Sequence, residues 1–225
     1  MEVMTMIRLT LLGLILLIVI GCSTCNGGNE MSIQDKYDQM LLTSARIETE
    51  ISSGSGTAID QYGGFTIVLT ARHVIEDAEE IYVRFYSEGT DYPATVLKVS
   101  EDHDLALLMV QHRHRHAANW GEPFEALVFW EVFKVGYALG YDEPLVTEGV
   151  ISAVDEYHFV TSSPVVWGDS GGGIFWFDDE TDEFTLIGVT AALGVARSGG
   201  GAFPVFHIGY ATDMFAAEEL FQQEE

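Results

Sequence analysis

The chain has 225 residues, of which 48% are hydrophobic and 12% aromatic, and it carries a formal net charge of -25 at pH 7. This composition can fill the core of one ordinary domain or of two small joined ones, and it excludes a largely disordered chain. A surface this acidic repels phosphate backbones, so we expect no nucleic acid among the partners.

The N-terminal segment is typical of a targeting sequence. An apolar run from Leu9 to Ile20 follows Arg8 and ends in small residues. A run of about a dozen residues is short for a membrane span but suits the apolar part of a secretory signal peptide. We therefore expect residues 1–21 to be a signal peptide and residues 22–43 to be a tether and N-terminal segment, with a helical turn or two in Ser32–Leu42.

Both cysteines of the chain, Cys22 and Cys25, follow this run, so the part from residue 26 onward can hold no internal disulfide. Val19-Ile20-Gly21-Cys22 resembles the lipobox of bacterial lipoproteins. The resemblance implies cleavage before Cys22, acylation of its sulfur, and a protein secreted across the inner membrane and anchored by lipid in the cell envelope. The alternatives are a plain secretory signal cut elsewhere and an uncleaved short anchor.

From residue 44 onward, short runs rich in Val, Ile, Thr, Tyr and Phe alternate with Gly, Asp and Ser, which is typical of an all-β protein. The first six predicted strands are Ser44–Glu50, Gly56–Asp60, Phe65–Thr70, Ile81–Phe85, Tyr92–Ser100 and Leu105–Val110. The second six are Val132–Tyr137, Val146–Val154, Phe159–Thr161, Gly173–Phe177, Phe184–Thr190 and Val205–Tyr210.

Two groups of six strands favour two small closed barrels, because closure removes exposed sheet edges. The segment Asn119–Pro123 is the predicted linker, so we place the N-terminal barrel at 44–118 and the C-terminal barrel with a terminal helix at 124–225. Two helices are expected: a short one in Arg72–Ala78, and a last one in Asp213–Phe221 that Thr212 would cap.

Three segments carry residue types suited to amide hydrolysis: Thr70-Ala71-Arg72-His73, Asp104 before an apolar strand, and Gly168-Asp169-Ser170-Gly171-Gly172. A serine hydroxyl is a weak nucleophile, so it needs an imidazole to take its proton and a carboxylate to hold that imidazole's tautomer. The candidates are Ser170 as nucleophile, His73 as base and Asp104 as orienting acid, with Asp102 as the rival acid. The glycines allow a sharp turn that points the N–H groups of Gly168 and Ser170 at one oxygen, as an oxyanion hole requires.

The order His, Asp, Ser with these motifs resembles the trypsin-like (chymotrypsin-like) serine peptidases, and among them the HtrA-type bacterial branch. Ser53–Ile59 looks like the family's opening Gly-Ser-Gly strand, and Val146–Ser152 resembles the strand that precedes the serine loop. The resemblance covers about residues 44–221. It implies two six-stranded Greek-key barrels with a short C-terminal helix, an active site between the barrels, endopeptidase activity on polypeptides, and no metal or organic cofactor.

The resemblance also implies a specificity pocket. Pro164 and Val165 would lie in the loop at its base, and Ala192 and Leu193 would follow the strand that forms one wall. All four residues are apolar, so the pocket would prefer small or medium aliphatic side chains.

The sequence departs from the family pattern at two positions of the serine loop. Gly173 stands where proline is usual, and Asp169 stands where the HtrA branch usually has asparagine. In trypsin-like zymogens this aspartate pairs with a new N-terminus made by cleavage, but the chain has no Arg- or Lys-Ile-Val-Gly-Gly activation site. Asp169 therefore needs another partner if it is buried. We also expect no PDZ domain after the second barrel.

Other interpretations compete at three places. The alternating His112, His114 and His116 would share one face of a strand, but the interleaved arginines disfavour a metal ion, and we expect none. The Gly-x-Ser-x-Gly pattern also occurs in α/β-hydrolases, which would require His207, an acid such as Asp182 and a helix after the serine. The alternative function is a catalytically silent lipoprotein of the peptidase fold that binds peptides or acts as a chaperone.

Overall fold

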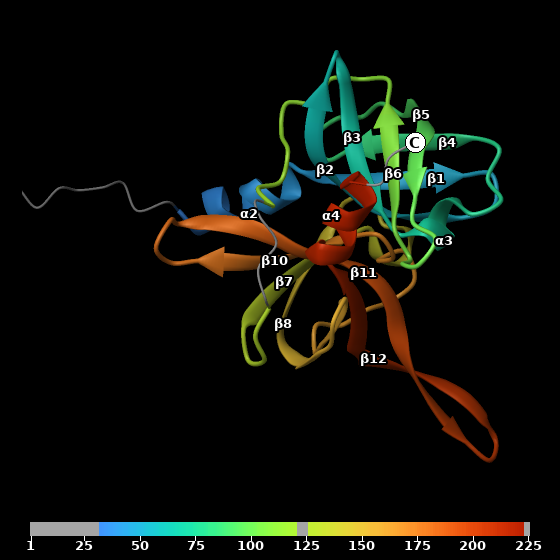
Figure 1. Cartoon of the computed structure of the whole chain (residues 1–225), viewed down its shortest axis with the longest axis vertical. Coiled ribbons are helices and arrows are strands. Elements are labelled where there is room, and N and C mark those ends of the chain that lie inside the picture. Colours follow the sequence, from blue (N-terminus) through green and yellow to red (C-terminus); the bar gives the residue numbers. More distant parts are fainter. Residues whose placement is uncertain (1–31, 121–125, 223–225) are drawn as a thin grey trace, which may run out of the picture. The chain divides into compact units, whose positions relative to one another are not determined.

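The structure, a computed structural model, describes residues 32–120 and 126–222 (Figure 1). The predicted signal peptide, Cys22 and part of the predicted linker lie outside these residues. Strands of the first barrel are β1 (Ser44–Thr49), β2 (Ser53–Tyr62), β3 (Phe65–Thr70), β4 (Ile81–Phe85), β5 (Tyr92–Val99) and β6 (Ala106–Val110). Strands of the second are β7 (Glu131–Gly136), β8 (Leu145–Val154), β9 (His158–Thr161), β10 (Gly173–Asp178), β11 (Glu183–Ser198) and β12 (Gly201–Asp213). The helices are α2 (Ile33–Leu41), α3 (Arg72–Ile75), the 3-10 turn η1 (Ala138–Gly140) and α4 (Met214–Gln222).

The two sheets close into barrels with the same strand order. The first runs β1-β2-β3-β6-β5-β4, and the second runs β7-β8-β9-β12-β11-β10 around its ring. Neighbouring strands pair antiparallel throughout. Each barrel thus repeats one Greek-key arrangement, and the predicted all-β fold of two six-stranded barrels with a C-terminal helix is confirmed.

Successive side chains of a strand point to opposite faces of the sheet, and for this reason neighbouring residues of one strand enter different hydrophobic clusters, of which the described residues form three. One cluster holds only first-barrel residues, such as Val83 and Leu108, and another only second-barrel residues, such as Ile151 and Phe159. In β6, Leu108 belongs to the first-barrel cluster, whereas Leu107 belongs to a third cluster that combines residues of both barrels. The strand is therefore apolar on both faces because each face is covered.

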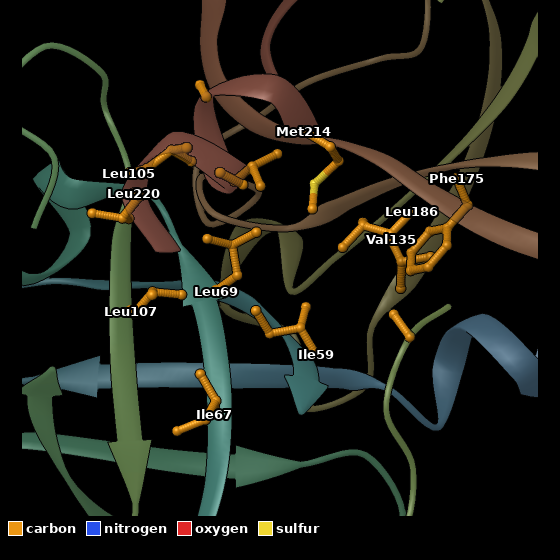
Figure 2. Packing of buried hydrophobic residues seen from close by; sticks show 14 of the residues in the cluster. Ile59, Ile67, Leu69, Leu105, Leu107, Val135, Phe175, Leu186, Met214 and Leu220 are labelled. Atoms are coloured by element: carbon orange, nitrogen blue, oxygen red, sulfur yellow. The ribbon is translucent and has the colours of Figure 1, made fainter. Parts of the chain in front are cut away.

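The third cluster joins the two barrels and the last helix (Figure 2). It combines Leu69 and Leu107 of the first barrel with Phe175 of the second, and Leu220 of α4 packs against them. A continuous apolar contact of this kind makes the junction between the barrels resemble a domain core. The residues that the barrels present to one another are thereby held at fixed positions.

The cluster predicts a large stability effect at Leu69, which is 0% exposed. Leu69→Ala should lower the free energy of unfolding by about 2–5 kcal/mol, because it removes buried methyl groups and leaves a cavity. Val96→Ala is the control, since Val96 is 44% exposed and its truncation should change stability by about 0.5 kcal/mol or less. Urea denaturation measures both, and equal midpoints for the two variants would contradict the packing assigned to Leu69.

The last two predicted strands and the predicted cap of the last helix differ from the structure. The expected strands Phe184–Thr190 and Val205–Tyr210 extend into a long hairpin, because residues after Thr190 keep pairing through two register shifts up to Ser198 opposite Gly201. Figure 1 shows this β11–β12 hairpin reaching beyond the second barrel. The last helix is capped by Asp213 rather than Thr212, because Asp213 Oδ1 accepts the N–H groups of Phe215 and Ala216.

No helix among residues 32–120 and 126–222 is long and apolar enough to cross a membrane.

Candidate active site

His73 and Asp104 meet because β3 pairs with β6. Thr70 lies opposite Ala106, so the start of α3 lies beside the loop that precedes β6. His73 Nδ1 donates a 2.6 Å hydrogen bond to Asp104 Oδ2, and the backbone N–H of His73 donates one of 3.0 Å to Oδ1. The rival Asp102 is exposed. Asp104 therefore holds both the ring and the backbone of His73 and leaves Nε2 for a reaction partner.

The contacts of the pair set its protonation. The hydrogen bond to Asp104 raises the pKa of His73 above its usual value, although partial burial opposes this. Burial pushes the pKa of Asp104 upward, but the hydrogen bonds from His73 outweigh it and the pKa is lowered. The carboxylate is thus kept ionised next to an imidazole that readily takes up a proton.

This shift predicts the pH dependence of reaction at Ser170. His73 accepts a proton only in its neutral form, so the rate should rise with pH and reach half its maximum above the usual histidine pKa of about 6.5. The rate of labelling by a fluorophosphonate, measured between about pH 5 and 9, tests this. A midpoint at or below the usual value would mean that Asp104 does not raise the pKa of His73.

Glycines shape the loop that carries Ser170 between β9 and β10. Gly168 has a φ of +95°, and a Cβ there would lie 2.3 Å from the Tyr137 carbonyl oxygen. Gly171 has a φ of +84°, and a Cβ there would lie 2.1 Å from the Ser55 carbonyl oxygen. Left-handed backbone at such close approach admits only glycine.

Gly173, the departure from proline, opens β10 within the core. A Cβ at this position would lie 2.7 Å from the Phe175 ring and 2.7 Å from Thr57 Oγ1. A side chain here would require the side chains of Phe175, Thr57 and Leu186 to shift. Gly173 therefore fits tightly at the entry of the strand.

Backbone hydrogen bonds hold the loop on both sides of Gly168 and Ser170. The N–H of Asp169 donates to Val166 O at 3.2 Å, and that of Gly171 donates to Thr190 O at 2.8 Å. The N–H groups of Gly168 and Ser170 donate to no other described residue. These are the two groups that the sequence predicts for an oxyanion hole.

Ser55 of β2 ties this loop to the first barrel. Its N–H donates to Ser170 O at 2.8 Å, and its hydroxyl donates to Gly168 O at 2.7 Å. The same hydroxyl accepts the N–H of Tyr137 at 2.8 Å. Ser55 is buried, so these bonds are shielded from water and restrict the loop strongly.

A cavity of about 500 Å³ lies between the barrels, with His73 and Ser170 both in its wall. The first barrel and α3 contribute Ser52, Ser53, His73 and Val74, and the second barrel contributes Leu139, Gly140, Trp167, Gly168 and Ser170. No hydrogen bond joins the Ser170 hydroxyl to the His73 ring among the described contacts; such bonds often tighten only when substrate binds.

The four predicted pocket residues do not line this cavity. Pro164 and Val165 precede Gly168 in the loop that carries Ser170. Val165 is buried and its N–H donates to Phe206 O at 2.8 Å, while Pro164 is half-buried. Ala192 and Leu193 lie on β11 opposite Tyr210 and Gly209.

Trp167 and Leu139 are among the lining residues that were not predicted from the sequence. Trp167 is 65% exposed and precedes the Gly168 motif directly, which is the signal that was available for it. Leu139 lies in η1 with a φ of +55°, and nothing in its sequence neighbourhood marks it.

Asp169 has a buried partner, Lys134 of β7. The Lys134 ammonium forms an ion pair with Asp169 Oδ2, and the two side chains are 1% and 0% exposed. Burial lowers the pKa of Lys134, and Asp169 restores part of that shift. The partner that the sequence left open is therefore an internal lysine.

One histidine cluster offers donor atoms of the types that bind metal ions. Glu88, His112 and His114 place one such atom each within 4.8 Å of one another. The His114 ring nitrogens already face Glu88 Oε1 at 2.7 Å and Leu42 O at 2.6 Å. A metal ion would have to displace the Glu88–His114 hydrogen bond. His116 does not belong to this group, and His207 is exposed on β12.

The chain matches a family model described as a trypsin-like peptidase domain over residues 54–189, more than half of its 225 residues. A probable periplasmic serine endoprotease, DegP-like, from Pseudomonas fulva is 30% identical over 177 residues, which cover 75% of this chain and 35% of that protein. The corresponding protein of Chlamydia pneumoniae is 28% identical over 183 residues, covering 77% and 34%. The chain thus spans about a third of the length of these relatives.

Two solved structures share the fold. The serine endoprotease from Yersinia pestis superposes with a TM-score of 0.69 at 20% identity, covering 85% of this chain and 65% of that one. The HtrA-type protease AlgW with tripeptide also gives a TM-score of 0.69, at 24% identity, covering 85% and 62%. An α/β-hydrolase fold is excluded, since Ser170 is followed by strand β10 and not by a helix. The chain belongs to the trypsin-like peptidase family, and it is similar to the DegP-like and HtrA-type proteins named above.

Proposed function

We propose that the protein is a serine endopeptidase that cleaves polypeptides through an acyl-enzyme on Ser170. The observation that carries the proposal is the shared cavity of Ser170 and the His73–Asp104 pair, beside two N–H groups that donate to no other described residue. The DegP-like relatives, described as serine endoproteases, support the same activity.

In this reaction the Ser170 hydroxyl oxygen attacks the scissile carbonyl carbon while His73 Nε2 takes the hydroxyl proton. Asp104 Oδ2 stabilises the imidazolium through the Nδ1–H bond. The carbonyl oxygen becomes an oxyanion and accepts hydrogen bonds from the N–H groups of Gly168 and Ser170. When the C–N bond breaks, His73 returns the proton to the leaving amine. Water then attacks the ester carbon and gives a proton to His73. The bond between that carbon and the Ser170 oxygen breaks, His73 returns the proton to this oxygen, and the acid product leaves.

Labelling of the purified full-length protein with a fluorophosphonate tests this function. We expect covalent labelling of the wild type and none of Ser170→Ala, because the probe reacts only with an activated serine. Mass spectrometry of the labelled peptide should locate the adduct at Ser170. A folded wild-type protein that stays unlabelled but binds peptides would favour the silent peptide-binding alternative.

The substrate class and location form a finer part of the proposal. The family resemblance implies a separate specificity pocket formed by Pro164, Val165, Ala192 and Leu193. These apolar residues support a preference for small or medium aliphatic side chains, which cleavage of a peptide library measures. The DegP-like relatives are described as probable periplasmic proteins. With the lipobox-like segment, this supports an envelope protein anchored at Cys22.

Cys22→Ser should move the protein from the membrane fraction to the soluble fraction, because the sulfur that would carry the lipid is removed. Unchanged fractionation would contradict the lipid anchor.

A further inference from the structure

The buried ion pair of Lys134 and Asp169 lies directly beside the proposed nucleophile. Asp169 precedes Ser170 in the chain, and Lys134 projects from β7, where it pairs with Ile174 of β10. Both side chains are shielded almost completely from water. An ion pair in such a place costs desolvation energy, so it calls for an explanation other than general stability.

Asp169 is the centre of the loop's own hydrogen bonds. Its carboxylate Oδ2 accepts the Val166 N–H at 2.8 Å, and its N–H donates to Val166 O at 3.2 Å. Its carbonyl oxygen accepts the Gly172 N–H at 2.9 Å. The segment between Val166 and Gly172 contains both Gly168 and Ser170. Any movement of Asp169 therefore moves the N–H groups of Gly168 and Ser170, two residues that line the cavity.

The position of Asp169 depends on charge compensation. Lys134 is its only ion-pair partner among the described residues, and Asp169 Oδ1 has no hydrogen-bond partner there. Gly136 leaves the space for this oxygen, since a Cβ at Gly136 would lie 2.7 Å from it. A buried carboxylate without a cation would have to take up a proton or move towards water.

We propose that Lys134 is a positioning residue whose ammonium holds Asp169 inside the second barrel and thereby keeps the Gly168 and Ser170 N–H groups in the arrangement that binds the oxyanion. Lys134 belongs to strand β7, so the positive charge that pairs with Asp169 comes from a lysine side chain and requires no new N-terminus made by cleavage. This inference rests on the proposed endopeptidase function for its catalytic consequence, whereas its structural part concerns the loop alone.

Lys134→Met and the double variant that combines it with Asp169→Asn, both made in the full-length protein, test the proposal. Lys134→Met leaves a buried carboxylate alone, so the fluorophosphonate labelling rate and kcat should fall by about 100- to 1,000-fold, as expected when an oxyanion donor is lost. The double variant has no buried charge, and the asparagine amide oxygen that replaces the Asp169 carboxylate can still accept the Val166 N–H. Its labelling should therefore return to within about tenfold of wild type. Lys134→Gln is a milder second variant, with the same loss and the same rescue expected.

Hydrogen exchange supplies a readout that needs no activity. The amides of Gly171 and Gly172 are protected by Thr190 O and Asp169 O, so Lys134→Met should expose them and Asp169→Asn should restore their protection in the double variant. If the wild type does not react with the probe, the endopeptidase proposal fails while exchange still tests the ion pair.

Two results would overturn the role of Lys134. One is a folded Lys134→Met or Lys134→Gln protein that labels at the wild-type rate with unchanged exchange at Gly171 and Gly172. The other is a loss that Asp169→Asn does not reverse in a folded double variant, because the defect would then come from the missing lysine side chain and not from the unpaired carboxylate.

Discussion

His73→Ala is expected to lower kcat for peptide cleavage by about 10⁶-fold, which is the scale of loss when a triad base is removed. The variant would retain Ser170 and the proposed oxyanion donors, but nothing in the cavity could take the hydroxyl proton. The His73 side chain is 43% exposed, so its removal should leave the barrels folded. Initial rates with a fluorogenic peptide, measured on protein with a wild-type unfolding midpoint, give the comparison.

His158→Ala is the matched control, because the His158 side chain is 45% exposed and also faces an aspartate, Asp155. Its kcat should stay within about twofold of wild type, since surface substitutions away from a site change little. Equal losses in the two variants would show that the effect at His73 arises from general surface electrostatics, and the assignment of His73 as base would be wrong.

Asp104→Asn is expected to lower kcat by about 10⁴-fold with little change in KM. The amide has nearly the shape of the carboxylate, but it carries no charge to stabilise the imidazolium and does not select the tautomer with the proton on Nδ1. Loss of the Asp104 charge should also lower the pKa of His73 towards its usual value, so the residual activity should reach half its maximum at lower pH than in the wild type.

Asp102→Asn separates the two candidate acids. Asp102 is exposed two residues before Asp104, and its replacement should leave kcat and the pH midpoint unchanged. A larger loss at Asp102 than at Asp104 would reverse the assignment of the orienting acid. Both substitutions replace a carboxylate by an amide of nearly the same shape. A difference in kcat between the two variants therefore reflects the different contacts of the two carboxyl groups.

The geometry also explains why both barrels are needed at one site. His73 follows β3 and Asp104 precedes β6, so the first barrel alone sets their contact. Ser170 belongs to the second barrel, but Ser55 of the first barrel hydrogen-bonds both Ser170 and Gly168. The apolar cluster around Leu69 and Phe175 then keeps the two halves of the site in place.

Much of this organisation follows from the sequence by itself. Strand-like alternation in two groups of six determined two barrels, because short β-rich runs with frequent turns must pair with close neighbours and remove their edges. The motifs at His73, Asp104 and Ser170 each consist of a few consecutive residues. Gly168 and Gly171 beside Ser170 indicate a backbone conformation that only glycine adopts readily. Such features need only a few neighbouring residues to be recognised.

Only the tertiary structure decided the features that depend on distant pairing. Lys134 shares a strand face with the buried Val132, a hint in the sequence, but a lysine in β7 becomes an internal cation only when β7 pairs with β10 and Asp169 folds back over it. The β11–β12 hairpin is likewise longer than the sequence predicts, because residues after Thr190 pair with residues of β12 up to Ser198 opposite Gly201. The cavity wall at Trp167 and Leu139 is formed by loops, whose conformation is set by what they pack against and not by their own side-chain pattern.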